Sequence, residues 1–160
     1  MMKILNFKFE YDLYESIDEL DTVRKELIQK AVDAAGKAYA PYSNFHVGAA
    51  VLLGNGEIIS GNNQENASYP VGICAERTLL SYVHASFPDQ KKKILAITVL
   101  DTDLEVSPCG LCRQTIIEYE TVQKDPIEII LHNRSGTVLV IPSGATLLPL
   151  HFNSESLNDH

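Results

Sequence analysis

The sequence predicts an α/β fold in which helices cover the faces of a mixed β-sheet. Segments with helical periodicity alternate with short apolar runs that are typical of strands. In the middle of the chain a helical segment separates successive strands, and such crossovers bring strands parallel. A Gly-Asn-Gly turn at residues 54–56 joins two apolar runs and indicates an antiparallel hairpin. Parallel and antiparallel pairs together make a mixed sheet.

The chain has 160 residues, of which 45% are hydrophobic and 21% are charged. This length and composition suit one globular domain with a sizeable core. We expect that domain at residues 22–160, preceded by an extension of unknown role at residues 1–21. Within the extension, apolar and polar residues alternate in ILNFKFEY (residues 4–11), which suits an edge strand or a contact between subunits.

The first half of the domain is expected to hold a helix, a hairpin and a second helix. Residues 22–37 carry apolar side chains at helical spacing, with Gly36 near the end. Residues 46–53 and 56–61 are the two strands of the hairpin. The polar segment NNQENASYPVGI (residues 62–73) is expected to be a loop, and a helix begins near Cys74 and ends near Ser86.

The second half is expected to hold a strand, a helix and two more strands. Residues 93–100 form an apolar run typical of a buried strand. After a loop, a helix begins near Cys109. Residues 127–132 and 137–141 are strands joined around Gly136, and residues 145–152 form a short apolar turn.

The net charge of the chain indicates which kinds of binding partner are favoured. The formal net charge is −8, and the only basic run is KKK at residues 91–93. Nucleic-acid binders need clustered Lys and Arg, so a small uncharged or cationic substrate is favoured over a polynucleotide. No segment has the roughly 20 apolar residues that cross a bilayer. The N-terminus lacks the pattern of a secretory signal, so we expect a cytoplasmic protein whose three cysteines are thiols or metal ligands.

The three cysteines suggest a metal site. Cys109 and Cys112 stand in PCGLC, and Cys74 lies upstream; the predicted helices begin at Cys74 and Cys109. A lone CxxC pair is ambiguous between a redox pair, half of a zinc site and coincidence. Three protein ligands leave one position of a tetrahedral zinc open, as in catalytic zinc sites. The alternative is a closed site whose fourth ligand is a distant histidine: His46, His84 or His132.

Charged residues flank these cysteines. Glu76 can reach an open zinc position and carry a proton there, although a glutamate in a first helical turn can also simply stabilise the helix dipole. Arg77 and Arg113 are placed to donate hydrogen bonds to the thiolates and so tune the metal. Ordinary surface arginines are the alternative for both.

These residues resemble a known signature. CAE followed by PCGLC has the form of the zinc-dependent deaminases. KAYAPYSNFHVGAAVL, NNQENASYPVGICAERT and SPCGLCRQ are similar to the cytidine deaminase family, from about Leu27 to Gln114. The resemblance implies a three-layer αβα sandwich with a mixed five-stranded sheet. It also implies that Cys74, Cys109 and Cys112 hold one Zn²⁺ per subunit and that Glu76 is the proton shuttle.

The resemblance further assigns residues to the substrate. Asn63 and Glu65 match a pair that holds the ribose hydroxyls, and Phe45 matches an aromatic residue that packs on the substrate. The backbone of Ala75 matches a donor to the pyrimidine carbonyl. Tyr42 and Tyr69 match tyrosines near the subunit contacts and the pocket rim.

A cysteine as first ligand and a short chain resemble the homotetrameric, three-cysteine branch of the family. In that branch the active sites lie at subunit interfaces, and Phe152 resembles an aromatic residue that a neighbouring subunit lends to the pocket. One departure is His46, where the family commonly has proline. The backbone N–H at this position is therefore free to donate.

The implied activity is hydrolytic deamination of cytidine and deoxycytidine to uridine and deoxyuridine, with release of ammonia, in pyrimidine salvage. One alternative substrate is a modified aminopyrimidine nucleoside of the blasticidin type. An alternative from another class is a non-catalytic interaction module stapled by zinc. Glu76 beside an open coordination position favours the enzyme, and a closed four-ligand site would favour the module.

Overall fold

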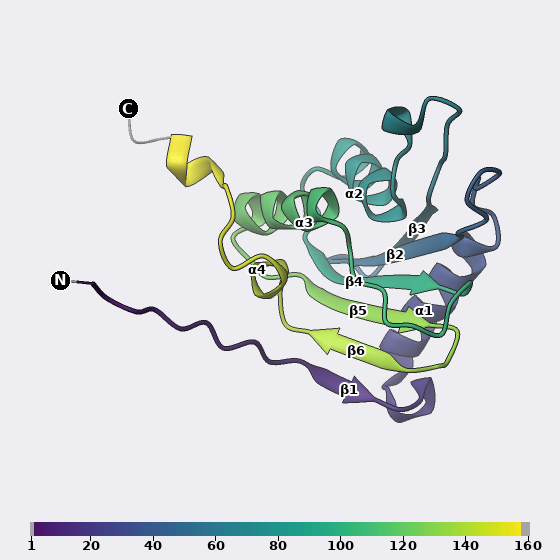
Figure 1. Cartoon of the computed structure of the whole chain (residues 1–160), viewed down its shortest axis with the longest axis horizontal. Helices are drawn as coiled ribbons and strands as arrows, with labels where there is room; N and C mark the ends of the chain where they lie inside the picture. The colour runs from purple at the N-terminus through teal and green to yellow at the C-terminus, as the bar shows by residue number, and fades with distance from the viewer. Residues whose placement is uncertain (1, 158–160) are drawn as a thin grey trace.

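The computed structural model describes residues 2–157 and contains one six-stranded sheet with the strand order β1-β6-β5-β4-β2-β3 (Figure 1). The strands are β1 (Asp12–Tyr14), β2 (Val47–Leu53), β3 (Ile58–Asn62), β4 (Lys92–Val99), β5 (Glu128–Asn133) and β6 (Val138–Ile141). The helices are α1 (Thr22–Ala35), α2 (Ala75–Ser86), α3 (Gly110–Gln123) and α4 (Gly144–Leu147), with short 3-10 turns η1 (Ile17–Glu19), η2 (Tyr69–Val71) and η3 (Ser154–Leu157).

The sheet has helices on both faces, which confirms the predicted three-layer αβα fold (Figure 1). On one face, α1 buries Leu27, Ile28 and Ala31 against the sheet. On the other face, α2, α3 and α4 enclose the larger core, in which Leu79 and Ile116 are fully buried. The central strands therefore need apolar side chains on both faces, as the near-continuous apolar runs of β2, β4 and β5 indicate.

The expected number of strands is corrected from five to six. The additional strand, β1, is only three residues long and pairs antiparallel with β6, with Leu13 opposite Leu139. The alternation at residues 4–11 suggests an edge strand, but the edge strand lies at residues 12–14, and three residues are too few to show a strand periodicity of their own. Residues 15–20 then pack Ile17 and Leu20 against the α1 side of the core. The predicted extension, residues 1–21, is thus divided into a packed part and residues 2–11, which lie outside the regular elements.

The hairpins and crossovers follow the predicted order. β2 and β3 are antiparallel, and Gly56 in their turn has φ +89°, a conformation that glycine adopts without strain. The crossover through α3 makes β4 and β5 parallel, with Thr98 opposite His132. The crossover through α2 leads from β3 to β4, which are separated by β2. The mixed character of the sheet is therefore confirmed.

Helix α1 approaches the sheet closely. Its N-terminus is capped by Asp21, whose carboxylate accepts a hydrogen bond from the Arg24 backbone N–H at 3.0 Å. At Gly48 of β2, a Cβ atom would lie 1.8 Å from the Ala31 carbonyl oxygen. Only glycine therefore allows this helix–strand contact. None of the helices in residues 2–157 is long and apolar enough to span a membrane.

Candidate active site

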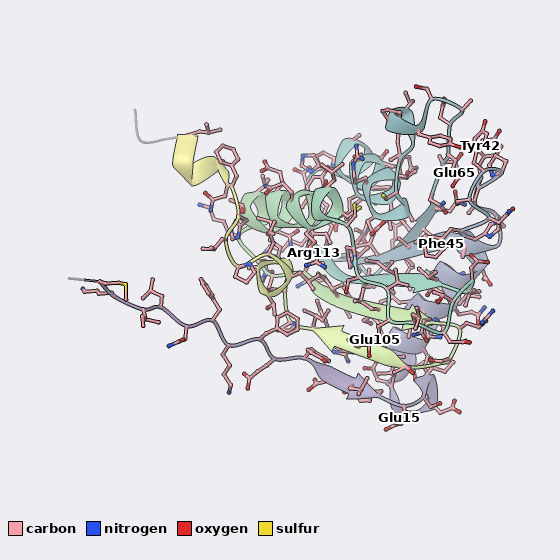
Figure 2. The ribbon with its side chains drawn as sticks, in the orientation of Figure 1. Glu15, Tyr42, Phe45, Glu65, Glu105 and Arg113 are labelled. Carbon is pink, nitrogen blue, oxygen red and sulfur yellow. The ribbon has the colours of Figure 1, made fainter. Side chains whose placement is uncertain are left out.

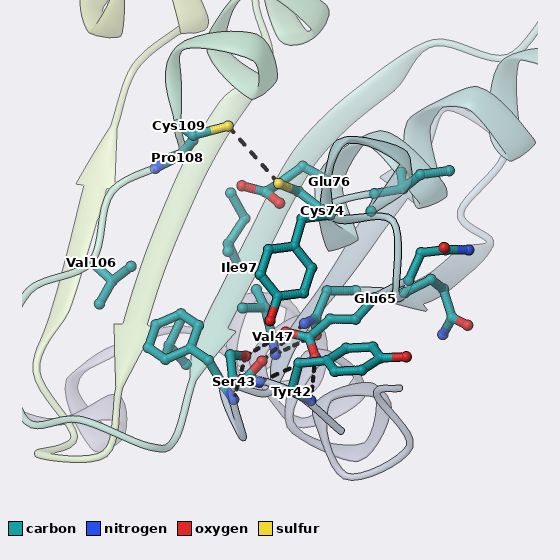
Figure 3. A pocket seen from close by; sticks show the side chains of 18 of the residues that line it. Tyr42, Ser43, Val47, Glu65, Cys74, Glu76, Ile97, Val106, Pro108 and Cys109 are labelled. Carbon is teal, nitrogen blue, oxygen red and sulfur yellow. Dashed lines mark hydrogen bonds between the residues drawn. The ribbon is translucent and has the colours of Figure 1, made fainter. Parts of the chain in front are cut away.

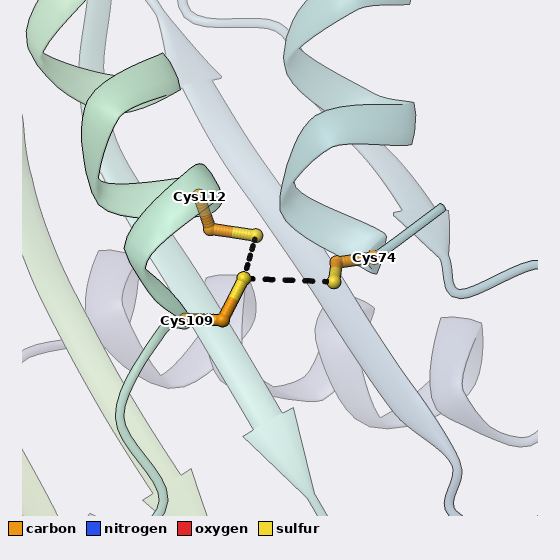
Figure 4. Close-up of side chains that lie close together, drawn as sticks. All are labelled: Cys74, Cys109 and Cys112. Atoms are coloured by element: carbon orange, nitrogen blue, oxygen red, sulfur yellow. Dashed lines mark hydrogen bonds between the residues drawn. The ribbon is translucent and has the colours of Figure 1, made fainter. Parts of the chain in front are cut away.

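Three sulfur atoms meet where α2 and α3 begin side by side on the sheet (Figure 4). Cys74 and Cys109 are the N-cap residues of these two helices, and Cys112 lies in the first turn of α3. The Cys74 and Cys109 sulfurs are 3.9 Å apart, and those of Cys109 and Cys112 are 3.4 Å apart. Zinc–sulfur bonds of about 2.3 Å in a tetrahedron place sulfurs about 3.8 Å apart, so the triad fits one zinc ion.

The electrostatic setting favours a thiolate at Cys74. Its pKa is lowered to about 6 by the adjacent Cys112 thiol, with further contributions from Cys109 and the Arg77 charge. The pKa of Cys112 is raised, because it faces the Cys74 sulfur and is fully buried. Both N-cap cysteines also lie at the positive end of a helix dipole. Thiolates are the form in which cysteine binds metal.

The cluster of possible metal ligands contains three side chains. Among residues 2–157, no His, Asp or Glu joins the three sulfurs, which lie within 4.8 Å of one another. The histidines considered as a fourth ligand have other neighbours. His46 lies 3.3 Å from Asp101, His84 is near Lys92, and His132 is near Thr98. The described residues thus form a three-ligand site, the kind that leaves a zinc position open.

A pocket of about 490 Å³ opens beside the sulfurs and includes Cys74, Cys109 and Glu76 in its wall (Figure 3). The Glu76 carboxylate lies beside Cys74 at the inner end of the pocket, and the residue is only 5% exposed. Burial raises the pKa of Glu76. A raised pKa strengthens a carboxylate as a base, which helps it to accept a proton before passing it on. This volume is in the range of small-molecule sites.

Asn63 and Glu65 line the same pocket and also organise it. The Asn63 side chain accepts from the Val47 N–H at 2.8 Å and donates to the Phe45 carbonyl at 2.9 Å. The Glu65 carboxylate accepts from the Tyr42 N–H at 2.9 Å and from the Ser43 hydroxyl. The Ser43 and Tyr42 hydrogen bonds lower the pKa of Glu65, which stays ionised. Both side chains therefore hold the loop that presents Phe45.

The predicted aromatic residues gather at the pocket. Phe45 is half-buried in its wall, and the Tyr42 and Tyr69 rings are 5.8 Å apart at centroid distance. Figure 2 shows Tyr42, Phe45 and Glu65 at the same end of the molecule. Ala75 is fully buried at the first position of α2, directly after Cys74.

Arg113 has partners that differ from the predicted thiolates. Its Nε donates to the Pro108 carbonyl at 2.8 Å, and its Nη1 donates to the Leu147 carbonyl at 2.9 Å. These bonds tie α3 to the segment before Cys109 and to α4. The physical reason is that α4 packs along α3, with the Gly144 N–H bonded to the Glu120 carboxylate and Leu147 near Arg113. Arg113 and Leu147 are far apart in the chain, so no local sequence pattern predicts this contact. Arg77 is half-buried, and its charge lowers the pKa of Cys74.

Phe152 is 59% exposed, and the pocket of its own chain is built without it. Its carbonyl accepts a hydrogen bond from Gln114 at 2.7 Å. The sequence reasoning missed several pocket residues. Ser43 has no motif of its own, and only its contact with Glu65 reveals it. The pocket wall also includes Ile97 and Val106. Ile97 lies in the predicted strand at residues 93–100, and that strand is the only sequence feature that points to it.

Fold and site together define a zinc-binding deaminase. The family model for the cytidine and deoxycytidylate deaminase zinc-binding region matches residues 21–125, which include the three cysteines and Glu76. The chain therefore belongs to the cytidine and deoxycytidylate deaminase family. The predicted family, and with it the predicted enzyme class, is confirmed.

This chain aligns with individual relatives over nearly the whole length of each relative. The cytidine deaminase of Halalkalibacterium halodurans is 40% identical over 137 residues, which are 85% of this chain and 98% of the relative. The crystal structure of cytidine deaminase from Burkholderia pseudomallei is 42% identical with a TM-score of 0.70, covering 79% of this chain and 97% of that one. Cytidine deaminase from Mycobacterium tuberculosis has a TM-score of 0.63 at 30% identity, covering 82% of this chain and 98% of its own.

Proposed function

We propose that this protein deaminates cytidine and deoxycytidine hydrolytically, yielding uridine and deoxyuridine plus ammonia, and that it serves pyrimidine salvage in the cytoplasm. The observation that carries this proposal is the buried Glu76 carboxylate in a pocket whose wall contains Cys74 and Cys109, two members of the three-cysteine cluster that could hold a metal ion. The relatives are named cytidine deaminases, which supports cytidine as a substrate.

One zinc ion per subunit would be held by Cys74, Cys109 and Cys112. The sulfur separations of 3.4 and 3.9 Å support this ligand set. Zinc in such a site lowers the pKa of water and supplies a nucleophile at neutral pH. The charge of Arg77 offsets part of the negative charge that three thiolates bring.

Glu76 moves the protons of the reaction. Hydrolysis at C4 of the pyrimidine requires a proton on N3 and another on the leaving amine. Glu76 accepts a proton from water, passes it to N3 and then assists protonation of the amine. Its burial, which raises the carboxyl pKa, supports this exchange.

Asn63 and Glu65 bind the sugar hydroxyls through the hydrogen-bonding positions that are not used by the loop at residues 42–47. A carboxylate has about four acceptor positions, and the loop uses three at Glu65, from Tyr42, Ser43 N–H and the Ser43 hydroxyl. The Asn63 amide has a second N–H beyond the one donated to Phe45. One acceptor and one donor suit neighbouring groups of a nucleoside. The Phe45 ring packs on the substrate, and the Ala75 N–H donates to the pyrimidine carbonyl.

The active unit is a homotetramer with its sites at subunit interfaces, and Phe152 of a neighbouring subunit completes the pocket. The exposure of Phe152, together with a pocket lining of its own chain that does not include it, supports this arrangement. Residues 22–160 are the catalytic domain. Neither membrane nor nucleic acid is a partner, in keeping with the net charge of −8.

The test is loss of the cytidine absorbance band in the presence of purified, zinc-loaded protein. Wild type is compared with Glu76→Gln, which keeps the shape of the side chain but cannot carry the proton. The expected result is turnover by wild type alone, with equal zinc in both proteins. Equal rates would overturn the role of Glu76. Inactivity of wild type on cytidine and deoxycytidine, with activity on a blasticidin-type nucleoside, would overturn the proposed substrate.

A further inference from the structure

The segment before β1 exposes a regular row of large apolar side chains. Residues 4–14, termed the N-terminal arm, include β1 at the sheet edge, and the chain before β1 continues outward beyond the edge of the sheet (Figures 1 and 2). Alternate side chains of the arm are apolar, and all of them are at least 45% exposed: Leu5, Phe7, Phe9, Tyr11 and Leu13. Contiguous apolar surface of this kind marks an interaction site in soluble proteins.

The row lies on one face of an extended strand. The Phe9 and Tyr11 rings meet edge to face with centroids 5.3 Å apart, so odd-numbered side chains share a side. Leu13 stands opposite Leu139, which belongs to the core under α3 and α4. The row therefore continues the apolar face of the sheet beyond the part that helices cover.

The arm also presents hydrogen-bonding edges. In the strand order, β1 is an outermost strand, and β6 occupies only one of its two edges. The free edge of β1 and both edges of residues 4–11 have no strand beside them in the described structure. Free edges and an apolar face together form a template for another strand. The family model begins at residue 21, so the arm lies outside the region that builds the deaminase site.

The charged residues on the opposite face of the arm indicate which strand pairs with it. Lys8 and Glu10 are the central charged pair, 2.5 Å apart and both highly exposed. We propose that the arms of two copies of this chain pair antiparallel about a two-fold axis at Phe9. Lys8 then faces Glu10 of the partner subunit, and Glu10 faces Lys8 of the partner subunit. A two-fold axis makes every such contact occur twice.

Neighbouring registers are less favourable. Centring the axis on residue 8 would place two Lys8 side chains opposite each other, and centring it on residue 10 would do the same to Glu10. Like charges directly opposite are destabilising in antiparallel pairs. A shift that pairs odd with even positions would put the two apolar rows on opposite faces. With the axis at Phe9, both rows share a face, and Phe7 lies opposite Tyr11 of the partner subunit.

The register is tested by photo-crosslinking from p-benzoylphenylalanine placed at position 9 of the full-length chain. A mixture of ¹⁴N- and ¹⁵N-labelled copies separates links between copies from links within one copy. The proposal expects a link between copies that maps to residues 7–11 of the second arm. A link that maps to another part of the second copy, or no link between copies, would overturn it.

Charge exchange provides the second measurement. Lys8→Glu alone and Glu10→Lys alone each place like charges opposite one another twice, and each should lower the crosslink yield about fivefold or more. The double variant Lys8→Glu/Glu10→Lys restores opposite charges and should recover the wild-type yield to within about twofold. Equal yields in the single and double variants would overturn the proposed register. Cytidine turnover of all variants is the control for folding and should stay unchanged.

Discussion

The backbone N–H of His46 donates to the Asp101 carboxylate at 2.5 Å, and the imidazole Nδ1 lies 3.3 Å from the same oxygen. These residues join the loop before β2 to the loop after β4. The first loop presents Phe45 to the pocket, and the second leads to Val106 and Cys109. The contact thus links the wall of the pocket that contains Phe45 to the wall that contains Cys109.

His46→Pro removes the donated N–H while matching the residue that the family commonly has. We expect the Michaelis constant for cytidine to rise about threefold to tenfold and kcat to stay within about twofold, because one charge-assisted hydrogen bond is lost and the catalytic groups are unchanged. Steady-state kinetics checks this. His46→Gln, which keeps the N–H, is the matched control, and identical kinetics for the two variants would contradict the positioning role.

Loss of one zinc ligand should lower both metal content and stability. Cys112→Ala removes a fully buried sulfur, so zinc per chain should fall to about one tenth of wild type or less, with a lower thermal midpoint. Elemental analysis and thermal unfolding measure these quantities. Glu76→Gln is the control that keeps the zinc, and retention of zinc by Cys112→Ala would remove that cysteine from the ligand set.

The contact of α1 with β2 should not tolerate a methyl group. A Cβ at Gly48 would lie 1.8 Å from the Ala31 carbonyl oxygen and 2.5 Å from the Ala35 nitrogen. Because both are backbone atoms, Gly48→Ala should lower the free energy of unfolding by about 3 kcal/mol or more, or prevent folding. Gly36→Ala is the control, since its Cβ would meet ordinary contacts at 3.7 Å and its φ is −61°. Urea unfolding should show a much lower free energy of unfolding for Gly48→Ala than for Gly36→Ala. Equal values would contradict the predicted clash between α1 and β2.

His132 should make stability depend on pH. Burial lowers the pKa of His132 below its ordinary value of 6.5, so the unfolded chain binds a proton that the folded chain does not. The stability that neutral His132 contributes is therefore present above pH 6.5 and is lost as pH falls below that value. His132→Gln removes this term. The unfolding free energy of the wild type should therefore fall relative to that of His132→Gln between pH 8 and pH 5, and parallel curves would contradict the prediction.

Much of the fold and the reactive centre follows from local sequence. Helical and strand periodicities predict the order of the elements within a few residues, because a periodic apolar stripe depends only on near neighbours in the chain. The positions of Cys74 and Cys109 can also be predicted from near neighbours in the chain. Each begins a helix, and the PCGLC spacing brings Cys112 into the first turn.

The contacts that organise the pocket join residues far apart in the chain. Glu65 meets Ser43, His46 meets Asp101, and Arg113 donates to the Leu147 carbonyl rather than to a thiolate. The sixth strand is also found only in the structure, because the three residues of β1 are recognisable by their pairing with β6 and not by their pattern. Periodicity specifies what each segment is, whereas the partners of a loop side chain depend on which loops the sheet brings together.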